Sequence, residues 1–224
     1  MSKSAIEVSF LIPCYNYGRY LRECIQSILD QTTLPPFEIL VIDDASTDDT
    51  QQVIQSFSHV PQLKSILHEK NQGHVISINK GLSLMKGRYV CRIDADDFYT
   101  PSFLERTLPL FDKGVGLVFG DVYLTDDTSK EKVPCVSSTQ HAGGVIQWPL
   151  VSLLTKNYIP APTVIATREA WLKALPIPTG FHHSDWYLSL RMSEINSFYY
   201  LKEPLSFYRV HSQNLHAKIE KNKG

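Results

Sequence analysis

Three aspartates stand close together in the segment Cys91 to Phe103, which reads CRIDADDFYTPSF. Asp94, Asp96 and Asp97 directly follow an apolar run, and carboxylates this close repel one another unless a cation or strong donors lie nearby. Asp94 and Asp96 are separated by one residue, so both side chains project to the same side of an extended segment. Such oxygen ligands suit Mg²⁺ or Mn²⁺, which commonly bind one or two carboxylates plus substrate phosphates. The alternative is an acidic loop that caps the next helix.

Strand and helix patterns alternate along the first half of the chain. Short apolar runs, typical of buried parallel strands, are followed by segments in which apolar residues recur at helical spacing. The predicted strands span residues 8–12, 37–42, 63–67, 89–93 and 115–123, and helices are expected within residues 21–29, 46–57, 75–85 and 100–111. This alternation predicts an α/β fold with a mostly parallel central sheet and helices on both faces.

Polar residues follow the predicted strands at the point where each strand ends. Ligands of a parallel sheet bind beyond the carboxyl ends of its strands. Residues 13–16, Asp43-Asp44, Asn71 and residues 94–97 should therefore share one rim of the sheet. Asp43 has an alternative role as a cap of the helix that follows it, for which Ser46 and Thr47 are further candidates.

The second half of the chain is less regular. Residues 125–145 are polar and rich in turn formers, which predicts a mobile loop. Beyond them we expect a strand at 162–166, helices at 168–175 and 185–192, and two short strands within 198–210 that are interrupted at Pro204.

The composition and the net charge exclude few functions, and they indicate neither nucleic acid nor an anionic membrane as a partner. Apolar residues make up 43% of the chain and the formal net charge is −1, so no basic field draws in nucleic acid. We expect neither a membrane span nor a secretory signal, and hence a cytoplasmic protein. The four cysteines lack C-x-x-C spacing, which favours reduced thiols in or near the core over zinc ligands or disulfides.

Longer motifs surround these polar clusters: SFLIPCYNYGRYLRECIQSILDQT, FEILVIDDASTDDT and NQGHVISINKGLSLMKGRYVCRIDADD. In this order and at these spacings they closely resemble the N-terminal half of family 2 glycosyltransferases with the GT-A fold. The resemblance is strong over residues 6–120 and continues more weakly to residue 212 through HSDWYLSLR and FYRVHS. It implies a Rossmann-like sheet with a smaller C-terminal acceptor region. The expected organisation is a single domain with a nucleotide-sugar-binding half, 1–124, and an acceptor and catalytic-base half, 125–224.

The resemblance implies a site for the donor nucleotide. In such enzymes the residues matching Pro13, Tyr15 and Asp43 hold the base of a nucleoside-diphosphate sugar, usually uracil or thymine. A carboxylate at position 43 can accept the imide N–H of a pyrimidine. The residue matching Asn71 borders the base, and that matching Asp94 lies near the ribose.

The resemblance also implies a divalent metal, Mn²⁺ or Mg²⁺. Asp96 matches the aspartate that coordinates the metal on the diphosphate, where the cation stabilises the charge of the leaving nucleoside diphosphate. His211 matches a histidine that in some relatives joins the metal or the diphosphate, and Arg209 lies two residues earlier on the same face of a strand. The alternative for His211 is a purely structural histidine.

Asp185, in HSDWYLSLR, matches the catalytic base of the family. By the family's mechanism it would deprotonate the acceptor hydroxyl as this attacks the anomeric carbon in line, which inverts the configuration. The structural alternative is that Ser184 or Asp185 caps the helix that follows.

Two departures from the family pattern concern the same site. Ile78 replaces a common arginine, for which His74, Lys80 or Arg88 would have to compensate, and Ser184 replaces a glutamate.

Together these residues predict a metal-dependent, inverting glycosyltransferase. Its donor would be a UDP- or dTDP-sugar and its acceptor a glycan or lipid-linked glycan, in surface polysaccharide or glycoconjugate biosynthesis. A lipid-linked acceptor would bring the protein to the inner face of the membrane. A sugar nucleotidyltransferase is an alternative, but PCYNYGRY lacks the glycine-rich basic phosphate loop that it needs after the first strand. A non-catalytic nucleotide-sugar-binding module is a further alternative.

Overall fold

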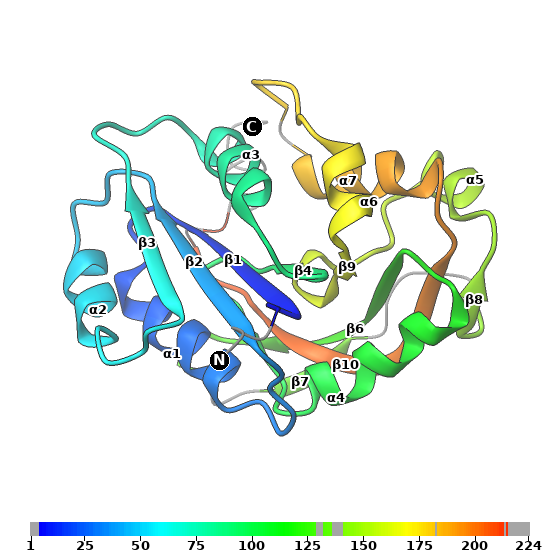
Figure 1. Ribbon diagram of the computed structural model, residues 1–224, viewed down its shortest axis with the longest axis horizontal. Helices are drawn as coiled ribbons and strands as arrows, with labels where there is room; N and C mark the ends of the chain where they lie inside the picture. The colour runs from blue at the N-terminus through cyan, green and yellow to red at the C-terminus, as the bar shows by residue number, and fades with distance from the viewer. Residues whose placement is uncertain (1–4, 129–131, 136–140, 182, 213, 215–224) are drawn as a thin grey trace.

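The computed structural model describes residues 5–128, 132–135, 141–181, 183–212 and 214. These residues form a ten-stranded sheet with the order β3-β2-β1-β4-β9-β6-β10-β5, in which β7 also pairs with β6 and β8 with β10 (Figure 1). The strands are β1 Val8–Cys14, β2 Phe37–Asp43, β3 Leu63–Leu67, β4 Tyr89–Arg92, β5 Phe98–Tyr99, β6 Leu117–Thr125, β7 Lys132–Cys135, β8 Gly144–Ile146, β9 Ile165–Thr167 and β10 Phe198–Arg209.

The sheet is mostly parallel, as predicted. Strands β3, β2, β1 and β4 run in the same direction, and so do β6 and β10. The short strand β9 lies between these two blocks and is antiparallel to both β4 and β6. One reversed strand thus joins the two parallel blocks into a continuous sheet, and all the long strands end at the same edge.

Helices cover both faces of the sheet (Figure 1). They are α1 Gly18–Leu29, α2 Thr50–Ser56, α3 His74–Leu84, α4 Phe103–Thr107, α5 Pro149–Leu153, α6 Arg168–Ala174 and α7 Ser184–Ser193, with 3-10 segments at Leu108–Lys113 and Ala161–Thr163. Alternate residues of β1 enter two separate cores: Phe10 packs with α1, α2 and α4, and Leu11 packs with α3, α6 and α7. A run that is buried on both faces is what the continuous apolar sequence of β1 predicts.

Three predicted elements differ in the structure. The strand expected at 162–166 is a 3-10 segment over Ala161–Thr163, and β9 begins only at Ile165. The helix expected at 100–111 is α-helical only over α4 and then becomes 3-10, because Pro109 has no N–H to continue the α-helical ladder. The two short strands expected around Pro204 are one strand, β10, whose register against β6 shifts on each side of Pro204. These register shifts accommodate Pro204, which has no backbone N–H to donate to the neighbouring strand.

The segment predicted as a mobile loop, residues 125–145, contains regular structure where it is described. Strand β7 pairs with β6 in this segment, and β8 begins at its end. Residues 129–131 and 136–140 lie outside the described residues. The prediction of a structureless connection was therefore wrong for β7 and β8, whose short exposed sequences carry too little apolar patterning to mark them as strands.

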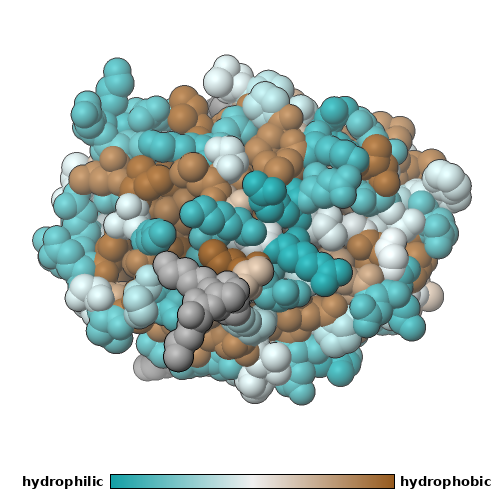
Figure 2. Space-filling view, in the orientation of Figure 1, coloured by the Kyte–Doolittle hydropathy of each residue, from teal (hydrophilic) through white to brown (hydrophobic). Residues whose placement is uncertain are grey.

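The surface and the cysteines agree with the compositional expectations. Hydrophilic and hydrophobic side chains are interspersed over the face seen in Figure 2. None of the helices that the structure describes combines the length and the apolar character needed to span a bilayer. All four cysteines are free thiols, and Cys14, Cys24 and Cys91 are buried, as predicted.

Candidate active site

A cavity of about 530 Å³ lies at the carboxyl ends of β1 and β4. Its wall continues through the start of α3, the 3-10 segment Ala161–Thr163 and the first turn of α7. Six of the nine predicted site residues line it: Pro13, Tyr15, Asn71, Asp94, Asp96 and Asp185. The fold thus brings residues from both halves of the chain to one site, as expected from the strand-end rule.

The structure places Asp43 behind the cavity wall and Asp44 on it. Asp43 is the last residue of β2, and its Oδ1 accepts the backbone N–H of Ser46 at 3.0 Å. Its Oδ2 is buried without a hydrogen-bond partner among the described residues. Successive side chains of an extended segment point in opposite directions, so only one of the two aspartates can face the cavity. Asp43 does not cap α2, which begins at Thr50.

Asp44, which the sequence analysis places on the rim without a binding role, is held by donors from the loop before α3. Its Oδ1 accepts the N–H of Gln72 at 2.9 Å, and its Oδ2 accepts that of Gly73 at 2.8 Å. Gly73 adopts φ 94°, a left-handed conformation that favours glycine. His68 Nδ1 lies 2.8 Å from Oδ1. Burial alone would raise the pKa of Asp44, but these hydrogen bonds outweigh it and lower the pKa.

Asp44→Asn should therefore destabilise the fold in a pH-dependent way. An acid whose pKa is lowered on folding contributes stability above its unfolded value, and this contribution is lost as the pH falls through the folded pKa. We expect a loss of about 2 kcal/mol at pH 7 that shrinks below about pH 4. Urea unfolding at pH 7 and pH 3 measures this loss in the free energy of unfolding. Asp30→Asn, at an exposed position, is the control. An equal loss at both pH values would contradict the assignment.

Asp94, which is half-buried, forms an ion pair with a buried residue that the sequence analysis missed. Arg92 Nη2 donates to Asp94 Oδ1 at 2.5 Å and also lies 3.2 Å from His74 Nε2. Desolvation alone would raise the pKa of Asp94, but the charge of Arg92 outweighs it and the pKa is lowered. Arg92 precedes Asp94 by two residues, so the period of an extended strand already indicates that both face one side.

Arg92 lines the cavity and carries a positive charge there, although position 78 lacks the arginine of the family pattern. Ile78 is wholly buried in the core on the α3 face of the sheet. Of the three residues expected to compensate, His74 lines the cavity, whereas Lys80 and Arg88 do not. The positive charge at the cavity therefore comes from β4 rather than from α3.

His211 contacts Asp96 directly. Its Nε2 lies 3.1 Å from Asp96 Oδ2, and both side chains are buried. Across the described ranges, no cluster of three or more His, Cys, Asp or Glu side chains forms a ready-made metal site. Asp96 and His211 still fit a divalent cation that takes its remaining ligands from a bound diphosphate, which is how Mg²⁺ is usually held.

Arg209 does not line the cavity but supports the acidic loop from behind. Its side chain is 1% exposed and its backbone N–H donates to Asp97 Oδ1 at 2.9 Å. Its guanidinium pairs with Glu23 Oε2 at 2.5 Å. The same guanidinium donates to the backbone carbonyls of Asp96, Asp126 and Asp127 at 2.8, 3.0 and 3.3 Å. Because all these partners are protein groups, Arg209 holds the loop in place.

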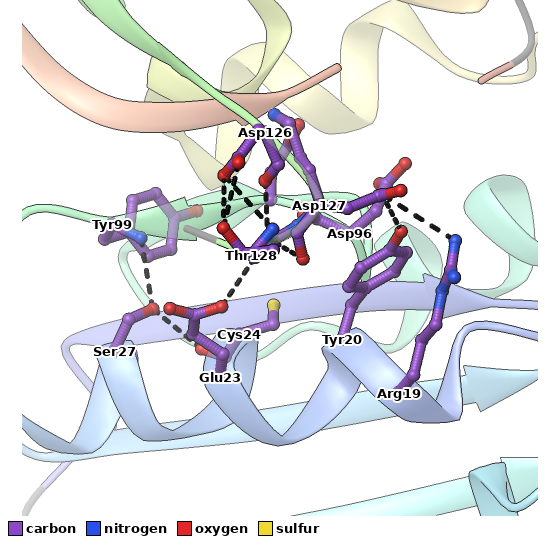
Figure 3. A network of polar contacts seen from close by, with 12 residues as sticks. Arg19, Tyr20, Glu23, Cys24, Ser27, Asp96, Tyr99, Asp126, Asp127 and Thr128 are labelled. Atoms are coloured by element: carbon purple, nitrogen blue, oxygen red, sulfur yellow. Dashed lines mark hydrogen bonds and ion pairs between the residues drawn. The ribbon is translucent and has the colours of Figure 1, made fainter. Parts of the chain in front are cut away.

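A polar network around α1 completes this support (Figure 3). Tyr20 and Arg19 both point from α1 towards Asp127, to which the Tyr20 hydroxyl donates and with which Arg19 pairs at 3.8 Å. Burial and the neighbouring Asp96 carboxylate raise the pKa of Asp97 well above its ordinary value. The acidic loop is thus fixed between α1 and the end of β10.

Asp185 lies in the first turn of α7 and faces the cavity. The N-cap residue of α7 is His183, and no side chain makes a capping hydrogen bond there, so the capping alternative for Ser184 and Asp185 was wrong. Asp185 Oδ2 instead accepts a hydrogen bond from Asn157 Nδ2 at 3.0 Å. A carboxylate in the first turn is also favoured by the helix dipole. The group is therefore available for proton transfer.

Known proteins share this architecture. The structure of TarS from S. aureus, residues 1–349 in complex with UDP-GlcNAc, matches 95% of the chain with a TM-score of 0.74 and 21% identity. The mannosyltransferase PcManGT from Pyrobaculum calidifontis, in complex with GDP-Man and Mn²⁺, matches 96% with a TM-score of 0.69 and 17% identity. The chain covers 61% and 60% of these two structures. The fold is that of GT-A glycosyltransferases.

Sequence comparison identifies the family. Chondroitin synthase of Escherichia coli is 30% identical over 220 residues, which cover 94% of the chain but 30% of that enzyme. The chain thus spans less than a third of the length of this relative. A family model described as glycosyl transferase family 2 matches residues 9–166, which is more than half of the chain. The protein accordingly belongs to glycosyltransferase family 2.

Proposed function

We propose that the protein transfers a sugar from a UDP- or dTDP-sugar to a hydroxyl group of a glycan or lipid-linked glycan, with inversion at the anomeric carbon. The observation that carries this proposal is that Asp94, Asp96 and Asp185, which come from opposite halves of the chain, line one cavity. The UDP-GlcNAc bound to TarS supports the class of donor. The chondroitin synthase relative supports a polysaccharide product.

The base of the nucleotide would lie beyond β1 and β2. Tyr15 is 44% exposed, so its ring is free to stack on a pyrimidine, and Pro13 and Asn71 border the same space. We assign acceptance of the imide N–H to Asp44 in place of Asp43, because Asp44 is the carboxylate on the wall. Its two oxygens have more acceptor sites than the three donors already present occupy.

Asp96 and His211 would hold a divalent cation against the diphosphate. When bound, such a cation stabilises the negative charge of the leaving nucleoside diphosphate. Arg92 adds a positive charge fixed by the protein beside Asp94. Arg209 and the α1 network hold the loop that carries Asp96, so the ligand need not order it.

Asp185 would act as the general base. Its carboxylate takes the proton of the acceptor hydroxyl as that oxygen forms a bond to the anomeric carbon, while the bond from this carbon to the diphosphate oxygen breaks. The proton then passes to solvent. Residues 1–124 thus supply most of the donor site and residues 125–224 the base, within one domain. We place the reaction in the cytoplasm, at the inner face of the membrane when the acceptor is lipid-linked.

Calorimetry with UDP, with and without Mn²⁺, tests this proposal. Mn²⁺ should lower the Kd for UDP. In Asp96→Asn, the Kd for UDP in the presence of Mn²⁺ should be about 10- to 100-fold higher than in wild type, because a charged ligand of the cation is lost. Asp112→Asn alters an exposed aspartate and is the matched control. If neither UDP nor dTDP binds in the presence of Mn²⁺, the proposed donor class is wrong. UDP binding without hydrolysis of any UDP-sugar would instead indicate a binding module.

A further inference from the structure

We propose that Asn157 is a positioning residue that holds the Asp185 carboxylate in one orientation. This inference rests on the proposed role of Asp185 as the base. Asn157 lies between α5 and the 3-10 segment Ala161–Thr163, in a part of the sequence where no motif marks it.

The orientation of the Asn157 amide follows from its second contact. The backbone N–H of Ile159 donates to Asn157 Oδ1 at 3.3 Å, so this end of the amide must be the oxygen. The other end is therefore Nδ2, which donates to Asp185 Oδ2 at 3.0 Å. This hydrogen bond fixes one oxygen of the carboxylate. Among the described residues, Asp185 Oδ1 has no hydrogen-bond partner, so it is the oxygen left to accept a proton.

A second hydrogen bond fixes the same two segments together. Trp186 Nε1 donates to the backbone carbonyl of Leu153 at 2.8 Å, next to the bond between Asn157 and Asp185. The segment that carries Asn157 then continues into residues 159–162, which line the cavity. One short stretch of chain therefore both shapes the cavity and aims the proposed base at it, which is the arrangement that orientation effects in catalysis require.

Other charged and titratable groups line the same cavity, among them Arg92 from β4, His74 from α3, Asp94 after β4, His183 before α7 and Tyr208 from β10. Variants of Asn157 leave these groups in place, so the difference from wild type reports the amide alone.

Hydrolysis of UDP-GlcNAc in the presence of Mn²⁺ tests the proposal. Asn157→Ala should lower kcat about tenfold with the Kd for UDP unchanged, because the base is no longer aimed at the cavity while the nucleotide end is intact. Asn157→Asp should lower kcat further, because a second carboxylate cannot donate to the first and repels it. Asn196→Ala is the matched control, since Asn196 Nδ2 donates to Met192 O at 3.0 Å at the far end of α7.

Two outcomes would overturn the role of Asn157. One is an unchanged kcat in Asn157→Ala, and the other is an equal loss of kcat and of UDP affinity, which would show a general structural effect. Full activity of Asp185→Asn would instead overturn the proposed function, so the two failures are distinguishable.

Discussion

Asp185→Asn should lower turnover by about 10²- to 10⁴-fold, the usual contribution of a general base. An asparagine oxygen can still accept the hydrogen bond from Asn157, so the substitution removes proton acceptance while it keeps the local geometry. The nucleotide end of the cavity is formed by other residues, such as Pro13 and Tyr15. The Kd for UDP should therefore change by less than about threefold, equivalent to under 1 kcal/mol. UDP release from UDP-GlcNAc and calorimetry measure the two quantities.

Glu194→Gln is the matched control for this experiment. Glu194 follows the last residue of α7 and forms an exposed pair with Arg191, so its neutralisation should leave turnover unchanged. A rate for Asp185→Asn within a few-fold of wild type would remove Asp185 from the chemistry. A parallel loss of UDP binding would show that the substitution acts on the nucleotide site, contrary to the assignment.

Arg209→Met should destabilise the protein by about 3 kcal/mol, near the lower end for breaking a buried charge network. The side chain of Arg209 is fully buried, and its loss removes the donor to the backbone carbonyls of Asp96, Asp126 and Asp127. The partner Glu23 is 42% exposed, so its carboxylate regains water, which keeps the loss near this lower end. Urea unfolding at pH 7 measures the change in the free energy of unfolding.

Arg106→Met serves as the comparison for Arg209→Met. Arg106 pairs with Glu203 on the surface at 2.5 Å, and such exposed pairs contribute about 0–1 kcal/mol. Equal losses for the two variants would contradict the role of Arg209 as an internal support. Because Arg209 holds the loop that carries Asp96, its variant should also weaken Mn²⁺-dependent UDP binding even where the protein remains folded.

The first half of the fold could be predicted from the sequence because each element has a strong local signal. Buried strands there are continuous apolar runs, and the helices between them have a clear apolar stripe. The strand-end rule then placed Pro13, Asn71 and Asp94 on a common rim before any coordinates were known. The fold of this half and the edge of the sheet that carries the site could be predicted because both follow from the spacing of apolar residues, which is visible in a single sequence.

The directions in which individual side chains point could not be predicted as well from the sequence. Asp43 and Asp44 are adjacent, and a shift of one residue in where β2 ends decides which of them faces the cavity. Arg209 is flanked by Tyr208 and Val210, and nothing in this local sequence indicates that its guanidinium is buried behind the loop. Asn157 gave no signal because its partner is 28 residues away in the sequence. Such roles depend on tertiary contacts, which periodicity does not report.

Strands β9 and β10 show the same limit at the level of elements. β9 has three residues, too few to define a period, and its reversed direction depends on the neighbours between which it lies. β10 continues through Pro204, which local rules treat as an interruption. Pairing with β6 supplies the stability that the local sequence lacks.

The fastening of the acidic loop by Arg209 has a consequence for biosynthesis. The loop lies at residues 94–97, yet the side chain that holds it belongs to the last strand of the sheet. During translation, a nascent chain can assemble β1 to β4 early, but this loop lacks its anchor until residue 209 has left the ribosome. Nucleotide affinity should consequently arise late in synthesis, and fragments that stop before β10 should lack it.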